Sequence, residues 1–312
     1  MARILVTGAS GLLGAAVLAA ASDRHQVTGQ FHRHEAAYPG VGMVRADLTQ
    51  EDQCDALVLE ARPDWIIHCA AATDVDRCEG DRGWARKMNR DLPRRVADRA
   101  RDVGARLAHI STDAVFDGRG GPYGEEDAPD PVNVYGRSKW EGERAVAETL
   151  PSALIIRTNF YGWNIQPKLS LAEWFLQHLR SGQPCPGFMD VEAAPLLAND
   201  LAAAILEMLD RDLGGTFHLG SPECVSKFEF GRRVAATFGL DETLIRPVSV
   251  EDIGLPARRP RRLCLAVEKA ERILRRSLPD ISDGLIRFRA LGEAGYVKRF
   301  QVLTEVGHGP AD

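Results

Sequence analysis

The sequence of 312 residues has no apolar run near the ~18 residues that a membrane span needs. It also has no excess of basic residues, because 39 lysines and arginines face 44 acidic residues, for a net charge of -5. We therefore expect neither a membrane protein nor a nucleic-acid partner. The composition of the whole chain, 45% hydrophobic and 27% charged, is typical of a globular protein, and its length suggests one large or two closely joined domains.

The cysteines also lack the spacing of a metal site, since the sequence has no Cys-x-x-Cys pair and no histidine near a cysteine at the spacing of metal-binding motifs. The six are scattered, at Cys54, Cys69, Cys78, Cys185, Cys224 and Cys264. From Met1 the chain enters a strand-like segment without a basic and then apolar leader. We expect no metal, free thiols in a reducing compartment, and a cytoplasmic location.

The N-terminal segment has the order strand, glycine turn, helix. A short apolar run, residues 3–7, precedes the glycines, and an Ala/Leu-rich helix follows to about residue 21. In this context glycines allow a tight turn and a close approach to a pyrophosphate, which the helix N-terminus attracts. The pattern predicts a dinucleotide-binding loop made of Gly8, Ser10, Gly11, Leu12, Leu13 and Gly14.

The second predicted strand, residues 26–31, ends in a basic turn. His32 and Arg33 follow it, and Glu35 is the first carboxylate. At this position an acidic residue would bind the free 2′-hydroxyl of NAD, and a basic residue would bind the 2′-phosphate of NADP. NADP(H) is therefore favoured over NAD(H), although a solvated basic turn would have the same sequence.

Later strand ends supply more candidate ligands. After a third strand at residues 43–46, Asp47 and Leu48 are predicted to cap the adenine, and Thr49 to cap a helix over residues 49–61. The strand at 65–69 ends in small residues, which let a ligand pass close by or simply pack tightly. The candidates for cofactor contact here are Cys69, Ala70 and Ala71.

The next two units lead to the candidate catalytic residues. Residues 81–104 predict a helix that Pro93 begins or kinks, and a fifth strand at 107–110 ends in hydroxyl side chains. A Pro-rich loop then delivers Tyr135 and Lys139 to a helix over residues 138–150. Four residues apart on one helix face, the lysine can lower the tyrosine's pKa and hold a cofactor's sugar, although such pairs are also common on protein surfaces.

The alternation of strands and helices predicts an α/β fold with a doubly wound parallel sheet. A sixth strand at 153–157 completes residues 1–160 as a dinucleotide-binding domain of Rossmann type. Helices at 169–180, 197–210 and 227–238 then predict a smaller, mainly substrate-binding lobe over residues 161–312, from which some segments return to the sheet.

Together these parts resemble an extended short-chain dehydrogenase/reductase, and more narrowly the dTDP-4-dehydrorhamnose reductases. The narrower resemblance is carried by AAATDVDRCE at 70–79, STDAVFDG at 111–118, NVYGRSKWEGE at 133–143 and Arg259-Pro260. It implies NADPH-dependent reduction of the 4-keto group of a nucleotide-linked deoxysugar. The family also pairs as a homodimer through helices that correspond to residues 81–104 and 138–150.

The resemblance also implies roles for single residues. Tyr135 would donate a proton, Lys139 would tune it and bind the nicotinamide ribose, and Thr112 would bind the carbonyl oxygen. Asn89 would be a structural or proton-relay asparagine near the cofactor. The candidate substrate-binding residues are Thr73, Val75, Asp113, Asn159, Phe160 and Arg259.

Two departures and two rival functions remain. Ala114 stands where the reductases usually carry an aromatic residue and the dehydratases a glutamate, which argues against a dehydratase; the segment 190–196 also keeps only the Asp and Pro of the family pattern. An epimerase would keep NAD bound. A non-catalytic NADP-binding subunit, like the one that regulates methionine adenosyltransferase, is the other alternative. The basic run at 258–262 would clamp a diphosphate or form a solvated loop.

Overall fold

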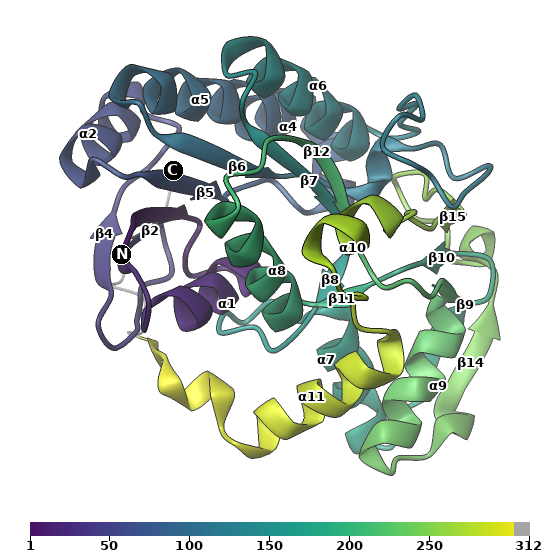
Figure 1. Ribbon diagram of the computed structural model, residues 1–312. Coiled ribbons are helices and arrows are strands. Elements are labelled where there is room, and N and C mark those ends of the chain that lie inside the picture. The colour runs from purple at the N-terminus through teal and green to yellow at the C-terminus, as the bar shows by residue number, and fades with distance from the viewer. Residues whose placement is uncertain (303–312) are drawn as a thin grey trace, which may run out of the picture.

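The computed structural model describes residues 1–302, and a seven-stranded parallel sheet forms its centre (Figure 1). The strand order is β12-β7-β6-β5-β1-β2-β4. The chain starts in the middle of the sheet, builds one half outward, and returns to build the other half from β5. Ligands of such sheets bind where the order reverses, here between β1 and β5. The predicted doubly wound fold is confirmed. The strands of the sheet are β1 (Arg3–Thr7), β2 (Gln26–Phe31), β4 (Gly42–Arg45), β5 (Trp65–His68), β6 (Arg106–Ile110), β7 (Leu154–Thr158) and β12 (Gly215–Leu219).

Helices cover both faces of the sheet because its central strands are apolar on both sides. Leu5, Ile66 and Leu107 face one helical layer, whereas Ile4 and Ile67 face the other. The first layer contains α2 (Glu51–Ala61), α5 (Leu92–Val103) and α6 (Val134–Thr149), and the second contains α1 (Leu12–Ala21) and α8 (Ala198–Asp210) (Figure 1).

A second, smaller core lies in the C-terminal half, where Phe175, Phe230 and Phe288 are buried around Tyr161. This core holds together three helices and two small sheets. They are α7 (Leu171–Arg180), α9 (Lys227–Phe238), α11 (Ile281–Glu293), the pair β9 (Cys185–Phe188) and β14 (Ile245–Val248), and the trio β10 (Glu192–Ala193), β13 (Val225–Ser226) and β15 (Arg262–Leu263).

Not all of the second half belongs to this lobe. β12 pairs with β7 at the edge of the large sheet, and α8 packs against α1. A domain boundary at residue 160 therefore remains a prediction. The last part of the predicted lobe, residues 303–312, lies outside the described residues. Within residues 1–302 no helix is both long and apolar enough to cross a membrane.

Local structure differs from the sequence-based expectation in three helices. The helix expected over 81–104 is divided into α4 (Arg82–Arg86), a π-helical turn (Lys87–Asp91) and α5, with Pro93 in the first turn of α5. The helix that carries Tyr135 begins at Val134 rather than residue 138, because Asn133 accepts a hydrogen bond from Gly136 N at 2.8 Å. Thr49 does not cap α2, since its hydroxyl donates to Asp47 at 2.8 Å.

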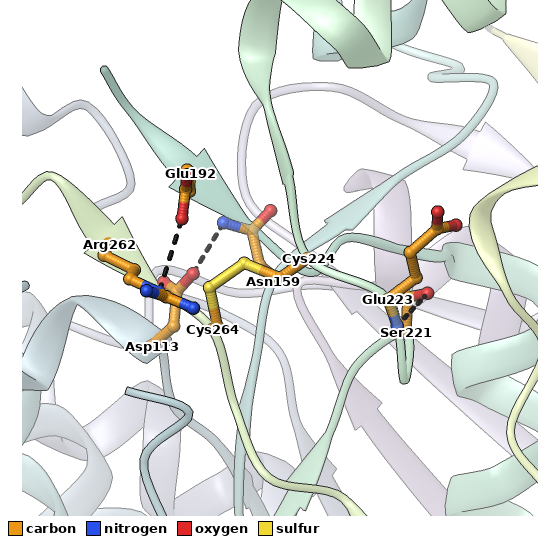
Figure 2. The surroundings of a disulfide bond; sticks show 8 residues. All are labelled: Asp113, Asn159, Glu192, Ser221, Glu223, Cys224, Arg262 and Cys264. Carbon is orange, nitrogen blue, oxygen red and sulfur yellow. Dashed lines mark hydrogen bonds and ion pairs between the residues drawn. A yellow bond between two sulfur atoms is a disulfide. The ribbon is translucent and has the colours of Figure 1, made fainter. Parts of the chain in front are cut away.

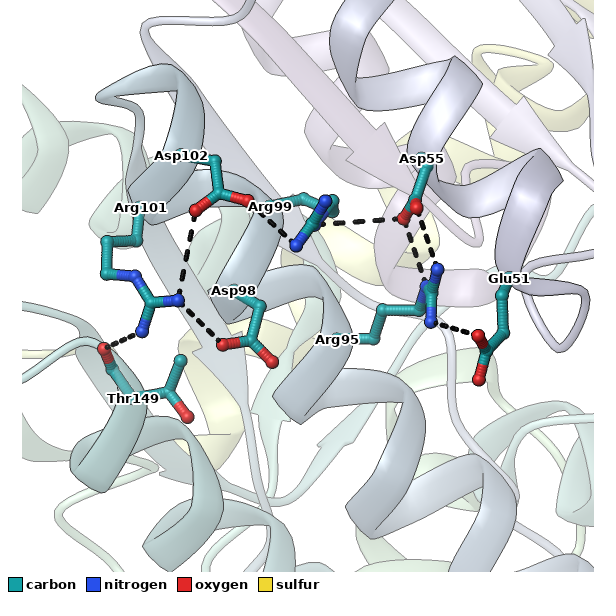
Figure 3. A network of polar contacts seen from close by, with 8 residues as sticks. All are labelled: Glu51, Asp55, Arg95, Asp98, Arg99, Arg101, Asp102 and Thr149. Carbon is teal, nitrogen blue, oxygen red and sulfur yellow. Dashed lines mark hydrogen bonds and ion pairs between the residues drawn. The ribbon is translucent and has the colours of Figure 1, made fainter.

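A network of charged side chains joins α2, α5 and α6 on the outside of the first helical layer (Figure 3). Arg95 binds Asp55 at 2.7 Å and Glu51 at 2.8 Å, and Arg101 reaches the carbonyl oxygen of Thr149 at 3.5 Å. These surface ion pairs each contribute only ~0 to 1 kcal/mol to stability. Their value lies in fixing the relative positions of three helices, and the pairing of two chains through α5 and α6 remains a prediction.

The prediction that all six cysteines are free thiols is wrong, because Cys224 and Cys264 form a disulfide (Figure 2). The bond joins the residue before β13 to the residue after β15, and both strands pair with β10. The error has a simple cause: the two positions are 40 residues apart, and only the fold brings them together. The free thiols are Cys54, Cys69, Cys78 and Cys185.

We expect the disulfide to stabilise the lobe through its closed loop. A bridge across 40 residues removes enough conformational entropy from the unfolded chain to contribute about 4 kcal/mol at 25 °C. The double variant Cys224→Ala/Cys264→Ala should therefore unfold at a lower urea concentration than the parent protein. Dithiothreitol should destabilise the parent protein and leave the variant unchanged, so equal unfolding of both proteins without reductant would contradict this assignment.

Candidate active site

A cavity of about 640 Å³ opens at the carboxyl ends of β1, β5 and β6, and most of the residues predicted from the sequence line it. Three of the predicted ligands, Asp47, Leu48 and Asn89, do not. The predicted residues in the lining are Gly8, Ser10, Gly11, Leu12, Leu13, Gly14, His32, Arg33, Cys69, Ala70, Ala71, Thr73, Val75, Thr112, Asp113, Tyr135, Lys139, Asn159, Phe160 and Arg259.

The glycine loop forms a cradle that larger residues would fill. Gly8 has a positive φ of 62°, and a Cβ on Gly14 would collide with the carbonyl oxygen of Gly8. Gly11 caps α1 without a side-chain hydrogen bond, and the first turn of α1 contains no acidic residue. The backbone N–H groups and the positive end of the helix therefore remain available to a phosphate. The loop fits the pyrophosphate of a dinucleotide.

The basic turn after β2 lies at the same cavity, with His32, Arg33 and His34 in its lining. Asp47 is not among the lining residues, although it lies 3.9 Å from His32; its carboxylate accepts a hydrogen bond from Thr49 N. Leu48 is 6% exposed and belongs to the hydrophobic core beside α2 and α5. The sequence could not separate these cases, because a residue after a strand can turn toward the ligand or toward the core.

Asn89 supports the site from behind. It is fully buried in the π-helical turn, where its amide donates to Ala72 O and to Ser138 Oγ, both at 3.0 Å, and its oxygen accepts from Ala72 N at 2.9 Å. All the polar groups of this amide are thus used inside the protein. Asn89 ties the segment after β5 to α6, so its position is structural in this conformation.

Tyr135 and Lys139 both lie in the cavity, one turn apart on α6. Burial raises the pKa of Tyr135 to about 12, against the effect of a hydrogen bond with Thr112. Burial lowers the pKa of Lys139 to about 8, against the attraction of Glu143. The ammonium of Lys139 donates to the carbonyl oxygen of Ile110 at 2.6 Å. The expected lowering of the tyrosine's pKa by Lys139 is therefore absent from this conformation, since burial dominates.

The Thr112 hydroxyl has one proton, and the structure shows where it goes. Thr112 donates to the carboxylate of Asp113 at 3.0 Å, while its oxygen accepts from Ala114 N at 3.2 Å. A substrate carbonyl can receive this proton only if Thr112 releases Asp113. Asp113 keeps a second partner in that case, because Asn159 Nδ2 donates to its other oxygen at 2.8 Å (Figure 2).

Several lining residues were missed by sequence reasoning. Lys227 is the most informative, since it brings a further lysine to the cavity that also holds Asp113 and Arg259. A lysine at the first position of a helix opposes the helix dipole, and that local conflict was a usable signal. Gln166 donates to Ser10 O at 2.9 Å, and Lys168 donates to Thr73 Oγ1 at 2.9 Å, but no motif indicated either residue.

The arginines of the segment 258–262 are mostly paired within the protein. Arg259 binds Asp76 at 2.7 Å and Ala257 O at 2.8 Å, and Arg261 binds Asp190 at 2.9 Å. Arg259 lines both the main cavity and a neighbouring cavity of about 630 Å³, whereas Arg261 lines only the neighbouring one. In this conformation the arginines of the run are thus held by partners within the protein, and their contact with a diphosphate remains a prediction.

Comparison with known proteins gives consistent matches over nearly the whole chain. The model of the family described as RmlD substrate binding domain matches residues 2–290. A probable low-salt glycan biosynthesis reductase of Haloferax volcanii is 37% identical, over 91% of this chain and 96% of that protein. Methionine adenosyltransferase 2 subunit beta of Danio rerio is 32% identical, over 86% of this chain and 84% of that protein.

A solved structure agrees with the fold. The dTDP-4-dehydrorhamnose reductase from Bacillus anthracis, crystallised in complex with NADP, superposes with a TM-score of 0.81 at 29% sequence identity. The match covers 93% of this chain and 99% of that chain. It extends over the sheet and the smaller lobe, so the arrangement of both is that of the reductase.

The buried carboxyl group of Asp113 should make stability depend on pH. Burial raises its pKa from 3.8 to about 6, so between these values the folded protein binds more protons than the unfolded chain. Stability should therefore fall as pH rises through this window, by up to about 3 kcal/mol for a shift of this size. Urea unfolding at pH 4 and pH 7 should show this loss in the parent protein and not in Asp113→Asn. The same pH dependence in both proteins would contradict it.

Proposed function

Because the chain belongs to the RmlD substrate binding domain family, we propose that it reduces the 4-keto group of a nucleotide-linked deoxysugar, using NADP(H) with NAD(H) as the alternative. One observation carries the proposal: Thr112, Tyr135 and Lys139 meet in a single cavity with the glycine loop. The relatives support the chemistry, since they include a reductase of glycan biosynthesis and a dTDP-4-dehydrorhamnose reductase. The assignment to the NAD(P)H-dependent oxidoreductases is confirmed by these relatives.

The cofactor would lie along the glycine loop, with its phosphates at the start of α1 and its 2′-phosphate near Arg33. When bound, it supplies a hydride to the carbonyl carbon of the substrate. The NADP in the Bacillus anthracis structure supports this cofactor, and so does the absence of a carboxylate between Phe31 and Glu35.

Tyr135 is suited to be the proton donor because its pKa of about 12 keeps the hydroxyl protonated near neutral pH. As the carbonyl oxygen gains negative charge, this proton can pass to it from Tyr135 Oη, and Thr112 can stabilise the same oxygen by a hydrogen bond. Lys139 would then stabilise the tyrosinate that is left and hold the nicotinamide ribose. Its ammonium has three N–H groups and one of them donates to Ile110 O, so the others are available for these two roles.

A second function is favoured by one observation, the 32% identity to methionine adenosyltransferase 2 subunit beta. That name describes a subunit of another enzyme. If this chain had such a role, it would bind a partner enzyme and would not need a proton donor. Co-purification with a methionine adenosyltransferase, together with no reduction of 4-ketosugars by NADPH, would favour the regulatory function.

The cytoplasmic location and the homodimer predicted from the sequence are part of the proposal. The pairing would use the outer surfaces of α5 and α6, where the charged network lies. Light scattering of the purified protein measures the number of chains directly. A monomer at micromolar concentration would remove the homodimer from the proposal without affecting the chemistry.

Replacement of Tyr135 by phenylalanine removes the acidic hydroxyl and keeps the ring. We expect folding and NADPH affinity to be retained and hydride transfer to slow by about 10² to 10⁴-fold, the usual contribution of a general acid. Lys139→Met should reduce both turnover and NADPH affinity, because Lys139 has two roles. The test combines single-turnover oxidation of NADPH with a fluorescence titration of the cofactor. Reduction of the ketosugar at the unchanged rate by Tyr135→Phe would remove Tyr135 from the mechanism.

Arg33→Ala should weaken NADPH far more than NADH. A charge-assisted contact to a phosphate is worth about 1.5 to 3 kcal/mol, or about 10- to 150-fold in affinity, and NADH has no 2′-phosphate to lose. Titration of both cofactors against the variant measures the ratio. Arg24→Ala is a suitable control, since Arg24 pairs with Asp210 and is not in the cavity lining. Equal weakening of the two cofactors would show that the turn after β2 does not read the phosphate.

A further inference from the structure

Lys227 occupies a position that is unfavourable unless an anion is bound there. It is the first residue of α9, directly after the N-cap Ser226, so its charge lies at the positive end of a helix of 12 residues. Lys227 is partly buried in the lining of the cavity, and burial lowers its pKa. Both effects work against a cation at this place. An anionic ligand in the cavity would reverse both, because it would interact favourably with the ammonium and with the helix.

The groups that face Lys227 do not supply this anion. Among residues 1–302 no hydrogen bond or ion pair to its Nζ is found, and its nearest described ring contact is Phe188, 5.5 Å from Nζ to the ring centroid. Asp113 attracts it, but the carboxylate oxygens of Asp113 already accept from Thr112 and Asn159. Arg259 repels it and is bound to Asp76 at 2.7 Å. Lys227 therefore lines the cavity with an ammonium that has no hydrogen-bond or ion-pair partner among the described residues, whereas Arg259 is already paired.

We propose that Lys227 binds the diphosphate of the nucleotide-linked substrate and so selects for nucleoside-diphosphate sugars. This inference rests on the proposed function and names the group that recognises the substrate class. Thr112 would hold the carbonyl at C4 of the sugar, and the diphosphate is attached at C1, across the ring from C4. Lys227 lines the same cavity as Thr112, but it comes from the start of α9 in the smaller lobe and not from the glycine loop. It is thus a cation that a diphosphate in this cavity can reach from the side of the smaller lobe.

The test uses ligands that need no turnover. Thymidine diphosphate and uridine diphosphate should bind the purified protein in a calorimetric titration, and thymidine should bind much more weakly. In Lys227→Met, which keeps the length of the side chain and loses its charge, we expect the affinity for both diphosphates to fall by about 10- to 100-fold. The affinity for NADPH should stay within about twofold. Lys227→Arg should retain most of the diphosphate affinity.

Two controls separate the possible causes. Lys269→Met removes an ammonium of another site, which binds Thr216 O at 2.7 Å outside the cavity, and it should leave diphosphate binding unchanged. Unchanged melting temperature and NADPH affinity of Lys227→Met establish that the variant is folded; if it does not fold, Lys227→Gln takes its place, with the same expected loss of diphosphate affinity.

Several outcomes would overturn the inference. Unchanged diphosphate affinity in Lys227→Met would mean that Lys227 only balances the charge of Asp113, and an equal loss of NADPH would place Lys227 at the cofactor. Failure of the parent protein to bind either diphosphate would also exclude it. If diphosphates bind through Lys227 but no ketosugar is reduced, the inference stands and the proposed reductase activity fails.

Discussion

The buried ion pair between Glu143 and Arg157 fixes α6 on the sheet, and the geometry of the candidate active site depends on it. Both residues are at most 6% exposed, their side-chain atoms meet at 2.8 Å, and Ser111 donates to the same carboxylate. Such a pair adds little net stability, but removal of either partner would leave a buried charge, so the arrangement is strongly specified. Tyr135, Lys139 and Glu143 follow one another on α6 at four-residue spacing. The ion pair therefore fixes how far Tyr135 and Lys139 extend into the cavity.

Close backbone contacts complete this constraint. A Cβ on Gly136 would collide with Ala114 O, and one on Gly142 would collide with Asn89 O. These glycines allow α6 to approach both the loop after β6 and the π-helical turn. Tyr135 on α6 and the hydroxyl of Thr112 are thereby held close together, although they belong to separate parts of the chain. Both side chains consequently line the same cavity.

The fold and most of the cavity could be predicted because they depend on local patterns. Strand, glycine turn and helix follow one another in sequence, and parallel strands bring their ends together, so Gly8, Thr112 and Tyr135 could be placed in one cleft. Whatever depends on distant packing could not be predicted. The Cys224–Cys264 bond, the position of Lys227 and the inward turn of Leu48 all follow from how the smaller lobe and the helices pack. The pKa of Tyr135 belongs here too, since burial outweighs a lysine that points elsewhere.

Three residues of the site, Asp113, Lys139 and Lys227, lie where burial disfavours their charged forms. Asp113 is a nearly fully buried carboxylate, and burial of such a group costs stability. Lys139 and Lys227 are cations that burial disfavours as well, and neither is within ion-pair distance of Asp113 in the described residues. A protein that had only to fold would gain by replacing all three with apolar residues. Their presence around one cavity therefore favours a catalytic site over a cleft that is merely left over from the fold, and the two lysines in particular would be stabilised by an anionic substrate and a phosphate-bearing cofactor.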